Sequence, residues 1–159
     1  MVIEGLGDYN LSVLISGIGS AVGCGIAGLA AIGAWKKAYA ANKVAPFILV
    51  AFVGMPLSQV IFGMILRNAI IAAKMPAELF LVQMYLGGAA GIVLAICSFV
   101  LGLCGAKACD AMVETGKGAG NYIMVLGVIE TVSLFVMVFC MTALPKAAAV
   151  AAAAAPALH

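Results

Sequence analysis

Charged residues are scarce in this sequence. They make up 9% of the chain, against roughly 25% in an average soluble domain. Hydrophobic residues make up 66% of the 159 positions, more than a soluble domain of this size could bury. We therefore predict that most of the chain lies in lipid. The first residues also lack the basic segment that opens a secretory signal peptide, so we expect no such signal there.

Basic clusters and metal-ligand patterns are also lacking. No group of Lys and Arg residues is interleaved with aromatic residues, so nucleic acid is not expected as a partner. The five cysteines have no metal-ligand spacing, and most lie within apolar runs. We interpret them as small packing residues rather than as ligands or disulfides. They are Cys24, Cys97, Cys104, Cys109 and Cys140.

Four long apolar runs fill most of the sequence. Each exceeds the ~20 residues that cross a ~30 Å hydrocarbon core. In lipid, such a run satisfies its own backbone hydrogen bonds only as a helix. We therefore predict an all-α membrane protein of four transmembrane helices, the last ending at Pro145. The runs are Leu11–Ala38, Pro46–Ala73, Leu79–Ala108 and Asn121–Leu144.

The second half of the sequence weakly repeats the first. The polar and glycine positions match at an offset of 71 residues, in the pairs Lys36 with Lys107, Gly17 with Gly88 and Gln59 with Glu130. We predict two fused helical hairpins, residues 1–76 and 77–146. The alanine-rich tail that follows, residues 147–159, is of low complexity and is expected to carry no chemistry.

The distribution of basic residues predicts an orientation in the membrane. Five of the eight Lys and Arg residues lie in the two hairpin loops, and three lie on the opposite side. The positive-inside rule then predicts that both hairpin loops are cytoplasmic and both termini are outside.

Glu130 is the one acidic residue within the four predicted runs, near the middle of the last. A charge at the bilayer centre costs roughly 2.5–3.5 kcal/mol on insertion scales. We expect the carboxyl to be neutralised, either by a proton or by a bound metal ion, which is the chemistry of a cation carrier. The alternative is that Glu130 only forms a hydrogen bond between helices, although Asn or Gln would do this at lower cost.

Further oxygen atoms are expected at the same depth. Pro56 has no N–H, so the carbonyl of Phe52 loses its helical partner and carbonyls near the kink become free. Ser58 and Gln59 add side-chain oxygens, as does Thr131 beside Glu130. A proton needs only the carboxyl, whereas a cage of oxygens would suit Na⁺. Ser58 and Gln59 could instead serve as hydrogen-bonding residues between helices, worth about 0.6 kcal/mol each.

Together these segments resemble the proteolipid subunit of V-type rotary ATPases, called K in bacteria and c elsewhere, in its duplicated four-helix form. The matching segments are Ser16–Ser20, Pro56–Gln59 and Glu130–Thr131. The resemblance implies a non-catalytic subunit without a cofactor, in a ring of identical copies in the membrane. Each copy would carry one ion on Glu130, with Gln59 in the equivalent position of the first hairpin. It also implies contacts with lipid, with a stator subunit whose arginine releases the ion, and with central-stalk subunits at the cytoplasmic loops.

The resemblance leaves the ion open between H⁺ and Na⁺. Sodium-carrying members resemble this chain in Ser58, Gln59 and the carbonyl of Met55. They also have a glutamine late in the third helix, where this chain has Gly105. If the ion is Na⁺, we expect Glu130, Gln59 and Ser58 to be metal ligands.

Two other functions remain open from the sequence. A small proton-coupled secondary transporter could use Glu130, but it would need an aromatic substrate pocket around the carboxyl. The neighbours of Glu130 are mostly aliphatic, and Phe135 and Phe139 lie further along. A purely structural four-helix membrane protein would leave the central carboxyl unexplained.

Overall fold

The computed structural model describes residues 7–154, and at positions 145–148, 150–152 and 154 it describes the backbone alone. These residues form helices and connecting turns, without a strand among them. Two short 3₁₀ helices, η1 (Met55–Leu57) and η2 (Ala77–Leu79), precede α3 and α4. The α-helices are α1 (Leu11–Ala40), α2 (Leu49–Gly54), α3 (Ser58–Ala72), α4 (Phe80–Thr115) and α5 (Ala119–Ala154).

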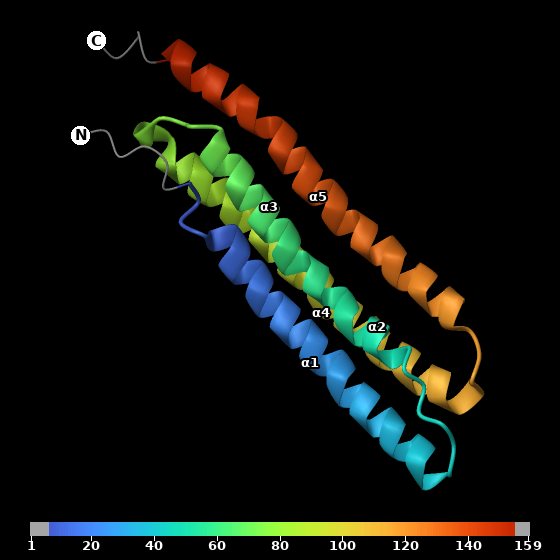
Figure 1. Ribbon diagram of the computed structural model, residues 1–159. Helices are drawn as coiled ribbons and strands as arrows, with labels where there is room; N and C mark the ends of the chain where they lie inside the picture. The colour runs from blue at the N-terminus through green and yellow to red at the C-terminus, as the bar shows by residue number, and fades with distance from the viewer. Residues whose placement is uncertain (1–6, 155–159) are drawn as a thin grey trace.

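Four helical segments in this part of the chain are long and apolar enough to span a membrane. The segment Leu49–Ala72 combines α2, η1 and α3, and the other three correspond to α1, α4 and α5. This confirms the predicted all-α class with four membrane-length helices. Figure 1 shows that both hairpin loops, α1–α2 and α4–α5, lie at one end of the bundle. The start of α1 and the end of α5 lie at the other end.

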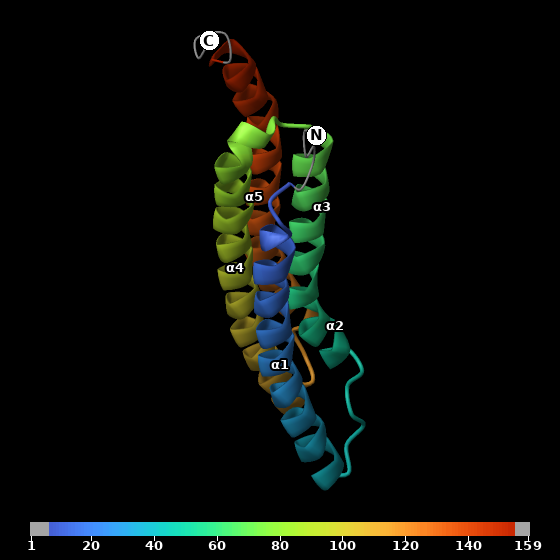
Figure 2. The ribbon, with the colours of Figure 1, turned by 90° about the vertical axis from the view of Figure 1, so that its left-hand side faces the viewer.

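Glycines bring α1 and α4 into direct backbone contact. A Cβ atom on Gly19 would collide with the Cα of Ala95, and one on Gly23 would collide with the carbonyl oxygen of Ser98. Gly102 on α4 lies in the same way against the backbone of Gly23. Because lipid provides no hydrophobic force between helices, close packing of small residues stabilises such pairs. Figure 2 shows α1 running alongside α4, so the glycine-rich α1 finds a close partner within its own chain.

The helices α3 and α5 run in the same direction, side by side (Figure 1). One buried cluster, near the hairpin loops, includes Phe52, Leu101 and Leu126. A second cluster, nearer the chain termini, includes Leu66 and Met137. Between these clusters along the bundle lie the buried polar residues Gln59 of α3 and Ser133 of α5.

Two predicted helix ends are wrong. The helix predicted to end at Ala108 continues to Thr115, and Asp110 and Glu114 belong to it rather than to a loop. Lys37 of α1 pairs with both carboxylates, at 3.5 Å and 4.0 Å. An apolar run marks where a helix leaves lipid, but the helix can continue into water when polar residues solvate its surface.

The last helix does not end at Pro145 and continues to Ala154. Proline removes one backbone donor, but alanine, the best helix former, follows it at most positions. The first part of the alanine-rich tail is therefore helical. Residues 155–159 of the tail lie outside the described residues.

Candidate ion-binding site

The second membrane-spanning helix is interrupted at Pro56. The interruption is the 3₁₀ turn η1, with Pro56 at its centre. Proline lacks the N–H that a regular helix requires, and a 3₁₀ stretch within a helix is a common site of a functional hinge. Ser58 and Gln59 are the first residues of α3 after this turn. The turn therefore decides where their side chains lie.

The carbonyls of Met55 and Pro56 at this turn are hydrogen-bonded, which corrects the expectation that the carbonyls near the kink are free. Ser20 Oγ of α1 and Ser98 Oγ of α4 both donate to the Pro56 carbonyl, at 2.8 Å and 2.9 Å. Ser58 Oγ donates to the Met55 carbonyl at 2.9 Å. These two carbonyls, which were expected to face a cation or water, therefore accept hydrogen bonds from serine hydroxyl groups instead.

The freed carbonyl of Phe52 lies against α4 at Gly105. A Cβ atom at Gly105 would lie 2.8 Å from this oxygen and 3.3 Å from the Cβ of Ala27. A glutamine at this position would therefore collide with its neighbours. Packing therefore explains why this position holds glycine, because a residue without a Cβ atom allows the two backbones to approach this closely.

Gln59 is fully buried, and its amide is only partly satisfied. Its Nε2 donates to Ser58 Oγ at 3.2 Å. Its Oε1 is buried and has no hydrogen-bond partner among the described residues. An unsatisfied buried acceptor costs about 1–3 kcal/mol. The segment Leu49–Ala72, long and apolar enough to span a membrane, therefore contains a buried acceptor without a donor among the described residues.

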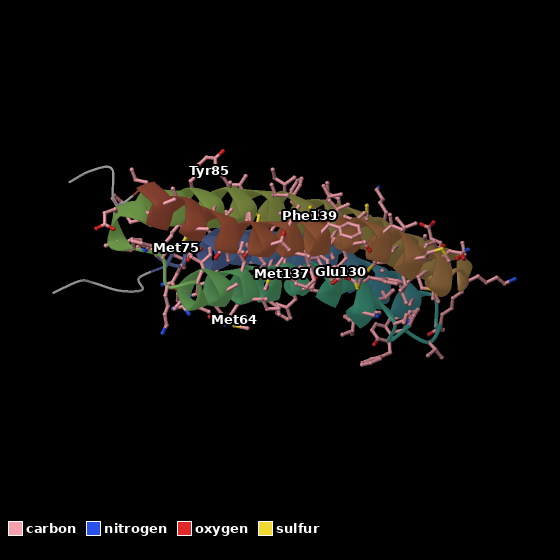
Figure 3. The ribbon with its side chains drawn as sticks, turned by 90° about the horizontal axis from the view of Figure 1, so that it is seen from above. Met64, Met75, Tyr85, Glu130, Met137 and Phe139 are labelled. Carbon is pink, nitrogen blue, oxygen red and sulfur yellow. The ribbon has the colours of Figure 1, made fainter. Side chains whose placement is uncertain are left out.

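Glu130 lies on the inward face of α5. The buried residues Leu126, Ser133 and Met137 lie four residues before, three after and seven after it, so the four side chains share one face of the helix. Glu130 itself is partly buried. In Figure 3, Glu130 and Met137 lie along the side of α5 next to α3, whereas Phe139 lies on another side.

Gln59 and Glu130 lie at the same depth. The register of the two parallel helices follows from one contact and one shared cluster: the Phe52 ring lies against the Tyr122 ring, and Leu66 belongs to the same buried cluster as Met137. Gln59 lies two turns from Phe52 and two turns from Leu66, and Glu130 lies two turns before Met137. The unpaired amide oxygen and the carboxyl are therefore at one level of the α3–α5 interface.

The carboxyl of Glu130 has no hydrogen bond or ion pair with any side chain or backbone group that the structure describes. The buried carboxyl of Asp8 provides a contrast. Its two oxygens accept the backbone N–H groups of Asn10 and Ser12, at 3.1 Å and 2.9 Å, at the start of α1. Such bonds satisfy an acid at a helix N-terminus. Asp8 caps the start of α1 with both of its oxygens, whereas the carboxyl of Glu130 has no such bonds within the described residues.

Two other polar residues of α5, Thr131 and Ser133, differ from each other in burial. Thr131 is exposed, and its hydroxyl donates to the carbonyl of Gly127 at 2.8 Å, so the fold does not bring it to Gln59. Ser133 is fully buried, and its hydroxyl has no partner among the described residues. The sequence reasoning missed Ser133, although its position three residues after Glu130 puts it on the same helix face.

No group of three or more His, Cys, Asp or Glu side chains within the described residues could hold a metal ion. A bound cation would therefore depend on a single carboxylate with neutral oxygens. No protein-family model matches the chain, and no curated protein matches it significantly.

Proposed function

We propose that this chain is the proteolipid subunit of a V-type ATPase rotor ring, and that it carries H⁺ or Na⁺ across the membrane on Glu130. One observation carries the proposal: an unpaired carboxyl lies at the depth of the unpaired, buried Oε1 of Gln59. Both groups belong to helices long and apolar enough to span a membrane. A proton or a cation between the two groups would satisfy both of them.

The alternative role of interhelical hydrogen bonding fits this geometry less well. A carboxyl kept only to join helices would be expected to have a partner within the fold, as Asp8 has. Glu130 has none among the described residues, and Gln59 Oε1 is an acceptor that a neutral acid could use. Protonated Glu130 would donate to it, and Na⁺ would be bound by both.

The same geometry explains how rotation could be coupled to ion occupancy. Glu130 is only partly buried within its own chain, so part of it would meet lipid or a neighbouring subunit. In lipid the ionised form is too costly, so the ring would turn only with the site filled. Opposite the arginine and water of a stator subunit, the ionised form becomes accessible and the ion leaves.

The proposal extends to the ends of the bundle. The common end of the hairpin loops carries Lys37, Asp110 and Glu114, all of them charged and accessible. We place this end in the cytoplasm, in contact with central-stalk subunits, and both termini on the outer side.

The ion remains H⁺ or Na⁺ in this proposal. The sodium ligands would be Glu130, Gln59 and Ser58, with the Met55 carbonyl. The Ser58 hydroxyl donates to that carbonyl, so both oxygens can serve a cation only through their remaining lone pairs. A proton needs only the carboxyl of Glu130, so the bond between Ser58 and Met55 does not affect it.

Labelling with dicyclohexylcarbodiimide, which attacks protonated carboxyls in apolar surroundings, tests the proposal. We expect Glu130 to be the labelled residue, with Glu114→Gln as a matched control that leaves labelling unchanged. Protection by Na⁺ but not K⁺ identifies sodium, and protection by high pH alone identifies protons. A Glu130 that stays unlabelled in the folded protein would contradict the proposal.

The oligomeric state separates a rotor subunit from a small secondary transporter. Glu130 does not line the apolar cavity of about 560 Å³ between α4 and α5, which is bounded by residues such as Leu103, Tyr122 and Leu126. In mild detergent we expect one large, stable homo-oligomer. A uniform population of monomers or dimers would count against the ring.

A further inference from the structure

Two serines outside the proposed ion site are attached to the turn that carries it. Ser20 of α1 and Ser98 of α4 are both buried, and both donate to the carbonyl of Pro56. Neither residue lies on α3 or α5, which hold Gln59 and Glu130. Two hydroxyls from two different helices on one carbonyl oxygen use both of its lone pairs. This oxygen is therefore fixed from two directions.

Ser20 holds the backbone on both sides of Gln59. Its hydroxyl donates to the Pro56 carbonyl at 2.8 Å and accepts the Val60 N–H at 3.2 Å. Pro56 and Val60 are four residues apart, and in a regular α-helix these two groups would bind each other. A side chain that enters this ladder is a known cause of a helix kink. Gln59 lies between the two backbone groups that Ser20 binds.

The side chain of Gln59 is held by a second series of bonds. Its Nε2 donates to Ser58 Oγ, and Ser58 Oγ donates to the Met55 carbonyl. With the nitrogen held in this way, Oε1 is the end of the amide that remains without a partner. The backbone clamp and the side-chain series together determine where this oxygen lies.

We propose that Ser20 and Ser98 are positioning residues that clamp the Pro56 carbonyl and thereby align Gln59 Oε1 with the carboxyl of Glu130. This inference rests on the proposed function, because it assigns the aligned oxygen to the ion on Glu130. In the protonated state the Glu130 O–H donates to Gln59 Oε1, which favours the neutral acid. When the clamp is lost, the turn shifts and that hydrogen bond is weakened.

Ser16 provides a matched control for the loss of a buried hydroxyl. It lies one turn before Ser20 on α1 and is equally buried. Its hydroxyl donates only within its own helix, to the carbonyls of Ser12 and Val13 at 2.6 Å and 3.2 Å. Ser16→Ala therefore removes a buried hydroxyl from α1 without touching the turn at Pro56.

The rate at which dicyclohexylcarbodiimide labels Glu130 in the full chain tests the clamp, when it is measured at one alkaline pH at which labelling of the wild-type chain has fallen well below its maximum. We expect Ser20→Ala and Ser98→Ala each to slow labelling about threefold, which corresponds to an interhelical hydrogen bond of average strength in a membrane. Ser16→Ala should label at the wild-type rate. If Ser20→Ala does not fold, Ser98→Ala provides the same test.

A double-mutant cycle separates positioning from a general loss of stability. If the serines act through Gln59, Ser20→Ala has no further effect once Gln59→Leu has removed the acceptor. Serine variants that label at the wild-type rate, or a Ser20→Ala effect that persists beside Gln59→Leu, would overturn the clamp while the proposed function stands. A wild-type Glu130 that is not labelled would contradict the proposed function, and the clamp with it.

Discussion

The ring of Phe52 lies edge-on to the ring of Tyr122, with centroids 6.1 Å apart and an angle of 76° between the planes. This contact joins the second membrane-spanning helix to α5, two turns from the level of Gln59. Edge-to-face pairs of this kind contribute about 0.5–1.5 kcal/mol beyond the area they bury. The pair is one of the two features that set Gln59 and Glu130 at the same level of the bundle.

Removing the Phe52 ring should destabilise the fold. Phe52 is fully buried, and truncation of a buried phenylalanine to alanine costs about 3–5 kcal/mol in soluble cores. We expect Phe52→Ala to lower the thermal unfolding midpoint in detergent clearly. Phe47→Ala is the matched control, because Phe47 is 83% exposed and its loss should change little. Equal effects of the two variants would argue against the register proposed here.

The contact between α1 and α4 should depend on the position of each glycine. A Cβ atom on Gly19 would collide with Ala95, whereas one on Gly25 would meet nothing within 4 Å. We expect Gly19→Ala to destabilise the folded chain by about 1–3 kcal/mol through overpacking. Gly25→Ala should be neutral or slightly stabilising, because alanine favours the helix. Thermal unfolding measures the stability of both variants. A Gly19→Ala variant as stable as the wild type would contradict the close contact between α1 and α4.

Replacing Gln59 should stabilise the folded chain but impair the proposed ion binding at Glu130. Its Oε1 is buried and unpaired, so Gln59→Leu removes an unsatisfied acceptor from the membrane interior. We expect Gln59→Leu to stabilise the chain by about 1 kcal/mol and to slow carbodiimide labelling of Glu130. The same substitution at the buried Gln83, outside the site, should leave labelling unchanged. A Gln59→Leu variant that is both less stable and normally labelled would show that Gln59 has a structural role.

The four helices and the candidate site residue Glu130 could be predicted from the sequence, because both follow from placing the chain in lipid. Four apolar runs can only be helices in lipid, and one acid among them stands out because hydrocarbon tolerates few charges. The offset of the repeat paired Gln59 with Glu130, and the parallel packing of α3 and α5 brings these two residues to one depth.

The sequence did not reveal features that depend on how the helices pack. Serine is common in membrane helices, so nothing in the local pattern separated Ser20 and Ser98, which bind Pro56, from Ser16, which binds its own helix. The collision that excludes a side chain at Gly105 involves a carbonyl from another helix. Such contacts between distant segments have no signature in a single sequence.

The charge state of Glu130 within a bilayer is the most direct measure of the proposed chemistry. Infrared spectroscopy of the protein in lipid, in sodium-free buffer near neutral pH, distinguishes a protonated carboxyl from a carboxylate. We predict a protonated band that disappears in Glu130→Gln, while the fold is retained. If Glu130 gives only the carboxylate band in sodium-free buffer, its charge is tolerated without a bound cation, and the proposed role as ion carrier is contradicted.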